Sequence, residues 1–194
     1  MGREFELKYR ATGEQLEEIE ACYQGFREIR METTYYDTPD GALRRRRWTL
    51  RRRLENGVSV CTVKTNLSDG SRGEWETECD CILSAIPKLV ALGAPEALAE
   101  YTGGGVTATC GARFLRKAIT LPSGSGLVEL ALDRGVLLGG GQELAFGEVE
   151  VELKKGTDQD AAAFAEALSA RFGLTPEPKS KLRRALDLAE ASSL

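Results

Sequence analysis

The sequence predicts an α+β fold, an eight-stranded antiparallel β-barrel that forms a tunnel with a charged lumen and helices packed outside. One observation behind this prediction is a series of short runs in which charged and apolar residues alternate, as on strands with one polar face. Another is that acids and bases gather on different runs, with Glu148, Glu150 and Glu152 on one and Arg51 and Arg53 on another. A solvated face would mix the signs, so opposite walls of an enclosed lumen explain the segregation better.

In the first half of the chain, alternation and turn residues predict strands at 3–10, 28–38, 43–54, 58–65 and 72–79, and helices at 12–22 and 84–101. The first strand carries Glu4, Glu6 and Lys8 on one face, because side chains alternate across a strand. Thr12 followed by Gln15 forms a capping box, which predicts the start of the first helix.

In the second half, the same signals predict strands at 106–121, 127–138 and 142–154, and helices at 158–173 and 179–191. Asn56-Gly57 and Asp69-Gly70 are typical of tight hairpin turns, and the three glycines at 139–141 predict a third reversal. Gly173 is a plausible helix stop. No linker or repeat divides the sequence, so we expect residues 1–194 to form a single domain.

The phase of each strand assigns its residues to the charged or the apolar face. The charged faces of the third, fifth and seventh strands are expected to carry Arg45, Arg47, Thr49, Arg51 and Arg53, then Glu74 and Glu76, then Glu129 and Asp133. The sixth strand is ambiguous, because Arg113 and Arg116 fall on opposite faces. Trp48 and Trp75 fall on the apolar faces, so we expect them in the core.

Composition excludes several classes of protein. The chain has 194 residues, a formal net charge of −4 and no histidine, which excludes a Ser-His triad, His-ligated zinc and histidine phosphotransfer. Five cysteines without paired C-x-x-C spacing are expected to be reduced and mostly buried. No apolar run has transmembrane length and the first residues lack a signal-peptide core, so a cytoplasmic location without a membrane partner is expected.

The charges of the expected lumen indicate which ligands it would bind. Carboxylates two residues apart on a strand converge on one side, as a hard divalent cation requires. The planar fork of arginine binds phosphate oxygens in bidentate fashion. Such a lumen is costly unless its charges are paired, solvated or filled by ligands. We therefore expect a divalent metal against the acidic wall and a phosphate-rich polyanion against the basic wall.

At these residues the chain resembles the CYTH superfamily, also called the triphosphate tunnel metalloenzymes. The matching pieces follow the family's order: Glu4-x-Glu6-x-Lys8, Tyr35-Tyr36-Asp37-Thr38-Pro39, Leu50-Arg51-Arg52-Arg53, Thr62-Val63-Lys64, Arg72-x-Glu74-x-Glu76, Glu129-x-x-x-Asp133, Glu148-x-Glu150-x-Glu152 and Lys179-Ser180-Lys181. The resemblance implies an eight-stranded antiparallel tunnel whose members hydrolyse or cyclise triphosphate compounds with magnesium or manganese.

Carried over position by position, the resemblance implies a set of site residues. The ligands of Mg²⁺ or Mn²⁺ would be Glu4, Glu6, Glu148, Glu150 and Glu152. The triphosphate would be bound by Lys8, Arg51, Arg53, Lys64, Arg116 and Lys181, although Arg113 and Lys117 compete with Arg116 for its place. A second metal, or salt bridges to the basic residues, would involve Glu74, Glu76, Glu129 and Asp133. Catalysis itself is expected to depend on Glu4, Glu6, Lys8 and Glu150.

The function predicted from these residues is metal-dependent hydrolysis of inorganic tripolyphosphate to pyrophosphate and phosphate. An inorganic substrate is preferred because no aromatic-rich, base-reading loop is evident. Thiamine triphosphatase and class IV adenylyl cyclase activities, which occur in the same superfamily, stay open, as does a non-catalytic polyphosphate or nucleotide sensor.

The expected partner is a small-molecule triphosphate, with a second copy of the chain in a homodimer as a further possible partner. Residues 44–53 could instead form a nucleic-acid surface. Their strict two-residue phase and the sequence pI of about 5.2 argue against it, because nucleic-acid-binding domains tend to be basic. We therefore expect no nucleic-acid partner.

Overall fold

The computed structural model describes residues 5–66 and 72–192. The strands are β1 (Glu6–Arg10), β2 (Arg27–Asp37), β3 (Thr49–Glu55), β4 (Val58–Asn66), β5 (Arg72–Glu78), β6 (Thr107–Ser123), β7 (Gly126–Gly139), β8 (Gln142–Lys155) and β9 (Thr175–Pro176). The helices are α1 (Gly13–Ala21), α2 (Ala42–Arg45), α3 (Ile82–Ala91), α4 (Ala97–Thr102), α5 (Asp158–Phe172) and α6 (Lys181–Ala191). Glu4 and the predicted turn at Asp69-Gly70 lie outside the described residues.

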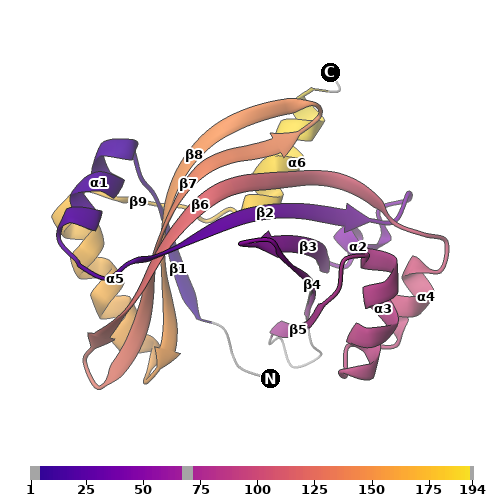
Figure 1. Ribbon diagram of the computed structural model, residues 1–194, viewed down its shortest axis with the longest axis horizontal. Coiled ribbons are helices and arrows are strands. Elements are labelled where there is room, and N and C mark those ends of the chain that lie inside the picture. The colour runs from indigo at the N-terminus through magenta and orange to yellow at the C-terminus, as the bar shows by residue number, and fades with distance from the viewer. Residues whose placement is uncertain (1–4, 67–71, 193–194) are drawn as a thin grey trace.

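The strands form one nine-stranded antiparallel sheet in the order β5-β4-β3-β2-β6-β7-β8-β1-β9. This confirms an α+β fold on an antiparallel sheet, whereas closure of the sheet into a barrel stays a prediction. The hairpin at Asn56-Gly57 is confirmed, since both residues have the positive φ angles, 51° and 90°, that such turns require. Figure 1 shows the long strands β2, β6, β7 and β8 as a strongly curved layer.

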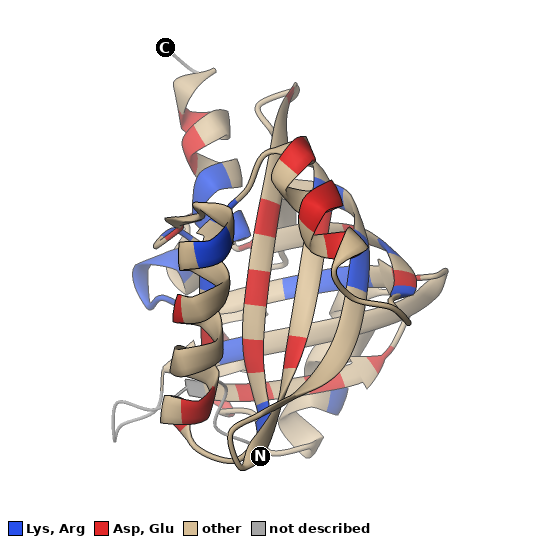
Figure 2. Cartoon of the chain, turned by 90° about the vertical axis from the view of Figure 1, so that its left-hand side faces the viewer, with Lys and Arg blue, Asp and Glu red and all other residues tan. Residues whose placement is uncertain are grey.

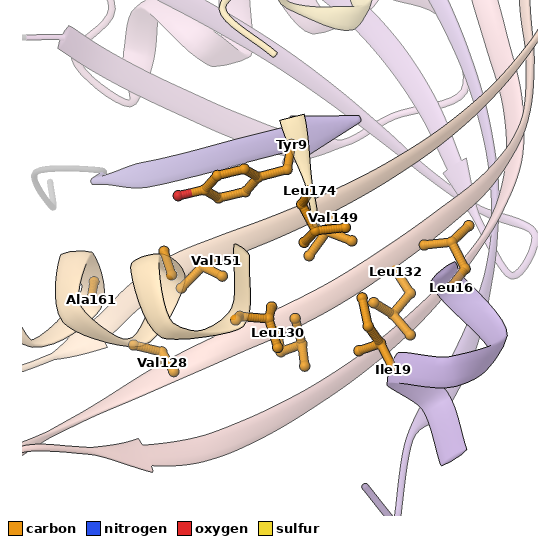
Figure 3. Packing of buried hydrophobic residues seen from close by; sticks show 12 residues of the cluster. Tyr9, Leu16, Ile19, Val128, Leu130, Leu132, Val149, Val151, Ala161 and Leu174 are labelled. Carbon is orange, nitrogen blue, oxygen red and sulfur yellow. The ribbon is translucent and has the colours of Figure 1, made fainter. Parts of the chain in front are cut away.

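The apolar faces of β1, β7 and β8 pack outward against α1 and α5, as the sequence predicts. Figure 3 shows Tyr9, Val149 and Val151 in this cluster, together with Leu16 and Ile19 from α1. These strand residues alternate with Lys8, Glu150 and Glu152, which therefore lie on the opposite, concave face of the sheet. Burial of this outer cluster stabilises the strands that carry the charged groups.

A second outer cluster covers β3 and β4 under α3 and α4. Leu50, Cys61 and Val63 are completely or almost completely buried there, and Trp48 and Trp75 pack against them. The two tryptophans therefore belong to the core, which confirms their predicted role. All five cysteines are free, as expected, but Cys22 and Cys81 are exposed rather than buried, so the expectation of mostly buried thiols holds only in part.

Helix α6 differs from the predicted arrangement, in which the helices lie outside the barrel. Its Ala185, Leu182 and Leu186 pack against Tyr35 and Phe114. Phe114 lies two residues before Arg116 and shares its face of β6, so α6 covers part of the concave, charged face. This packing brings the first residues of α6 to the predicted lumen.

Two predicted elements were wrong in extent. The strand predicted at 43–54 begins only at residue 49, because side chains at and just after the end of β2 start helix α2. Asp37 accepts the backbone N–H of Leu43 at 2.9 Å, and Thr38 accepts that of Ala42 at 2.7 Å. Arg45 therefore belongs to α2 and Arg47 to the turn before β3, so neither lies on the charged face of β3. The helix predicted at 84–101 is divided into α3 and α4 at Gly93, which has a φ angle of 103°.

Across the described ranges, no helix combines the length and the apolar character needed to cross a membrane.

Candidate functional site

A cavity of about 530 Å³ lies on the concave face of the sheet. Its lining includes most of the charged residues that the sequence assigns to a lumen: Glu6, Lys8, Arg51, Arg53, Lys64, Glu74, Glu76, Arg116, Glu150, Glu152 and Lys181. In Figure 2, acidic segments recur along the strands nearest the viewer, and basic segments appear on strands that cross behind them. All six predicted phosphate-binding residues thus face one cavity, although they come from β1, β3, β4, β6 and α6.

The basic wall of the cavity is formed by Arg51 and Arg53 on β3 and Lys64 on β4. Burial, together with the neighbouring charges of Arg51 and Arg116, lowers the pKa of Arg53 to about 10. The Nε atom of Arg51 is buried and has no hydrogen-bond partner among the described residues. Like charges crowded together with an unsatisfied donor are favourable only if an anion compensates them, so this wall is suited to bind a polyanion.

The acidic wall is formed where β1 pairs with β8. Glu6 lies directly opposite Glu152, and Lys8 lies opposite Glu150. Directly opposed like charges destabilise a sheet unless a cation lies between them or beside them. Lys154 contacts Glu152 at 2.9 Å, and Lys8 contacts Glu6 at 3.5 Å. Carboxylate oxygens are the donors that Mg²⁺ and Mn²⁺ prefer, so the residues present fit a divalent cation at this wall.

A buried acidic cluster lies deeper in the sheet. Carboxylate oxygens of Asp133, Glu148 and Glu150 lie within 4.8 Å of one another, a spacing that could hold a metal ion. However, the ammonium group of Lys181 contacts all three carboxylates, including Asp133 at 2.8 Å and Glu150 at 2.6 Å. Burial lowers the pKa of Lys181, but the three carboxylates outweigh it and raise the pKa overall. Lys181 thus supplies the positive charge of this cluster.

Two arginines complete the buried network. Arg116 donates to Asp133 at 2.7 Å and also contacts Glu150, which resolves the ambiguity on β6: Arg116 faces the cavity, whereas Arg113 is exposed and pairs with Glu143. Arg184 contacts the second oxygen of Glu148, a role that was not predicted from the sequence. The signal was its spacing, since Lys181 and Arg184 are three residues apart and share a face of α6.

The remaining predicted residues lie around this network. Glu74 contacts Lys64 at 3.1 Å and Arg51 at 3.6 Å, as expected of a carboxylate that fixes basic residues. Glu129 lies outside the cavity lining and contacts Lys154 at 3.6 Å. Lys117, the second rival of Arg116, pairs instead with Glu20 at 2.5 Å. Glu148 and Asp133 also lie behind the lining, fully buried.

The two glutamates of the buried cluster titrate in opposite directions. Burial raises the pKa of Glu148 to about 7, above its usual 4.5. Burial also opposes ionisation of Glu150, but Lys181 and Arg116 outweigh it and lower the pKa of Glu150. Below about pH 7 the folded protein therefore favours a proton on Glu148, while it keeps the charge on Glu150.

The raised pKa of Glu148 predicts a pH effect on stability. Because the pKa of Glu148 is higher in the folded state than in the unfolded state, protonation of Glu148 stabilises the fold. This stabilisation is complete below pH 4.5 and is lost as the pH rises through about 7. Glu148→Gln cannot ionise, so its free energy of unfolding should rise relative to wild type by about 1–3 kcal/mol between about pH 5 and pH 8. Urea denaturation at both pH values measures this difference. Glu143→Gln, an exposed site on the same strand, should show no such change; equal pH dependence of all three proteins would contradict the assignment.

The fold and the site together define a class of protein. Its antiparallel sheet is curved, and the concave face carries both carboxylates suited to bind a metal ion and cations suited to bind a polyanion. Residues 2–186 match the CYTH domain family. This chain belongs to that family. It is also 28% identical over 153 residues to an inorganic triphosphatase from Haemophilus influenzae. That match covers 78% of this chain but 44% of the relative, so the chain spans less than half of that protein's length.

Solved structures show the same fold. A putative adenylyl cyclase from Hippeastrum, described as having a dominant triphosphatase activity, superposes with a TM-score of 0.65 at 18% identity, over 100% of this chain and 97% of that one. The PH1819 protein of Pyrococcus horikoshii superposes with a TM-score of 0.64 at 21% identity, over 95% of this chain and 99% of that one. A putative adenylate cyclase from Bacillus halodurans superposes with a TM-score of 0.64 at 16% identity, over 95% of this chain and 98% of that one.

Proposed function

We propose that this protein hydrolyses a triphosphate in a metal-dependent reaction, and that the substrate is inorganic tripolyphosphate, cleaved to pyrophosphate and phosphate. The observation that carries the proposal is that Lys8, Arg51, Arg53, Lys64, Arg116 and Lys181 all line one cavity, together with Glu6, Glu150 and Glu152. The similarity to a relative named inorganic triphosphatase supports it.

The basic wall would hold and orient the phosphates. Arg51 and Arg53 offer guanidinium donors whose planar geometry matches phosphate oxygens, and Lys64 adds an ammonium from the adjacent strand. These groups would offset the charge that spreads over the oxygens as the phosphoryl group is transferred. Arg116 is held by Asp133 and Glu150, so its position is set before any substrate binds.

The acidic wall would hold a magnesium or manganese ion through Glu6, Glu150 and Glu152, with Glu4 on the segment that precedes β1 as a further predicted ligand. Such an ion supplies charge neutralisation on the phosphate oxygens and activation of water. Glu148 is placed differently from the family prediction, because it is fully buried behind the cavity lining, where Lys181 and Arg184 contact its two oxygens, whereas Glu150 lines the cavity. We propose that Glu148 positions Lys181 and, through it, Glu150.

Lys181, like Glu148, contacts other charged residues of the buried cluster, which bears on its predicted role in phosphate binding. It lines the cavity, but its ammonium group also contacts three carboxylates. An ammonium group has three protons to donate, and three carboxylates can accept all of them. We propose that Lys181 acts on the phosphates mainly by orienting Glu150 and by its positive charge.

Phosphate release tests the proposal. Purified protein should release phosphate from tripolyphosphate with Mg²⁺ or Mn²⁺ and lose that activity in excess chelator, because the metal held by the acidic wall is proposed to activate the attacking water. The panel should include ATP and thiamine triphosphate as matched substrates. Faster turnover of either organic triphosphate would reject the inorganic substrate, and cyclic AMP from ATP would show a cyclase.

A non-catalytic sensor is the second candidate. Tight binding of tripolyphosphate without turnover, in all metals tried, would establish a sensor and reject the hydrolase. The three carboxylates that face the phosphate-binding residues favour the hydrolase, since a sensor of anions gains nothing from an acidic wall.

A further inference from the structure

A second cavity, of about 410 Å³, adjoins the proposed triphosphate site. The two cavities share four lining residues, Tyr35, Thr49, Ser180 and Leu182. The second cavity opens where the loop around α2 meets the first turns of α6. The two cavities are therefore direct neighbours on the surface of the protein.

Three arginines line this second cavity: Arg44 from α2, Arg47 from the turn before β3 and Arg183 from α6. Arg44 and Arg183 both contact Glu190, at 3.2 and 3.1 Å. The carboxylate of Asp37, which also lines the cavity, accepts backbone N–H groups at the start of α2. The cavity thus has more positive than negative charge along its lining.

Arg47 differs from the other two arginines in two respects. It forms no ion pair with any described residue, and its φ angle is 59°, in the left-handed region. Its N–H bonds to the carbonyl of Arg44 at 2.9 Å, so it occupies the position just after a helix where glycine is usual. This backbone conformation is unfavourable for an arginine, and such strain is found most often at ligand sites, so Arg47 is a candidate for a binding role.

We propose that this second cavity is an anion-binding subsite for phosphate groups beyond the third, so that the protein also binds linear polyphosphates of four or more phosphates. The inference rests on the proposed function, because it requires the first cavity to hold three phosphates. Arg47 contacts the additional phosphate through its guanidinium group, and Arg44 and Arg183 raise the positive potential around it.

The variant Arg47→Gly tests the subsite, because its two expected effects have opposite signs. Glycine relieves the left-handed backbone, so the melting temperature should be equal to or above that of wild type. Loss of a charge-assisted contact should weaken the binding of tetrapolyphosphate by about tenfold. The binding of tripolyphosphate and of ATP should stay unchanged. Arg45→Ala is the matched control, since Arg45 pairs with Asp40 and lines neither cavity.

Isothermal titration in excess chelator measures these affinities without hydrolysis. Equal weakening of tripolyphosphate and tetrapolyphosphate would overturn the proposal, because Arg47 would then belong to the triphosphate site. Weakening of ATP alone would also overturn it and assign the cavity to an organic group. Unchanged binding of all three ligands would do the same. Absence of triphosphatase activity would reject the proposed function, but it would not change a measured difference between the binding of tripolyphosphate and that of tetrapolyphosphate.

Discussion

Glu6→Gln should lower the turnover of tripolyphosphate by about 10²-fold or more, while the melting temperature stays close to that of wild type. Glu6 lies opposite Glu152 in the pairing of β1 with β8 and lines the cavity. Glutamine keeps the shape of the side chain but removes one negative charge from the proposed metal site. Phosphate release at saturating substrate, measured over a range of Mg²⁺ concentrations, separates a loss of metal affinity from a loss of the chemical step.

The matched control for this variant is Glu18→Gln, an exposed glutamate on α1 that lies outside the cavity. It should have wild-type turnover and wild-type metal dependence. Normal activity of Glu6→Gln would contradict the assignment of the acidic wall to the metal. Equal losses in the two variants would show that the assay responds to net charge rather than to this site.

Lys181→Met should lower the free energy of unfolding by about 3–5 kcal/mol, the cost of breaking a buried ion pair by removing one partner. Lys181 contacts Asp133, Glu148 and Glu150, and the first two of these carboxylates have fully buried side chains. Methionine retains much of the aliphatic length but supplies no positive charge, so the three acids would have to protonate or repel one another. Urea denaturation near neutral pH measures the loss.

Lys179→Met is the matched control for the second variant. Lys179 lies two residues earlier and pairs with Asp187 at 2.8 Å, but it is exposed. Exposed pairs contribute about 1 kcal/mol at most, so this variant should unfold close to wild type. If Lys181→Met were as stable as Lys179→Met, the ammonium group would not compensate the cluster, and a metal ion would become the better candidate for that place.

Strand phase predicted much of the candidate site. Glu6 and Lys8 on β1, and Glu150 and Glu152 on β8, face the cavity because side chains alternate with a period of two and the opposite residues are apolar. The turn at Asn56-Gly57 was equally predictable, since it depends on local backbone preference. These signals are contained in a few consecutive residues, and the tertiary structure had only to preserve them.

The features that the sequence did not predict depend on contacts between distant segments. The periodicity of α6 identifies its apolar face, but it does not tell which side of the sheet that face covers. The helix at 42–45 depends on capping by Asp37 and Thr38, so a strand was the wrong prediction for residues with a plausible alternating pattern. Arg184 reaches Glu148 only because α6 covers the concave face, and its role therefore followed from the packing.

The position of α6 also has a consequence for biosynthesis. The carboxylates of Asp133 and Glu148 are synthesised well before Lys181, the residue whose ammonium group contacts both. In a nascent chain in which β6, β7 and β8 have paired but α6 is not yet made, the concave face is uncovered, so these acids stay in contact with water and repel one another without that cation. We therefore expect the concave face to pack stably only after α6 has left the ribosome, and we expect a chain truncated before residue 181 to be cut by proteases faster than the full chain.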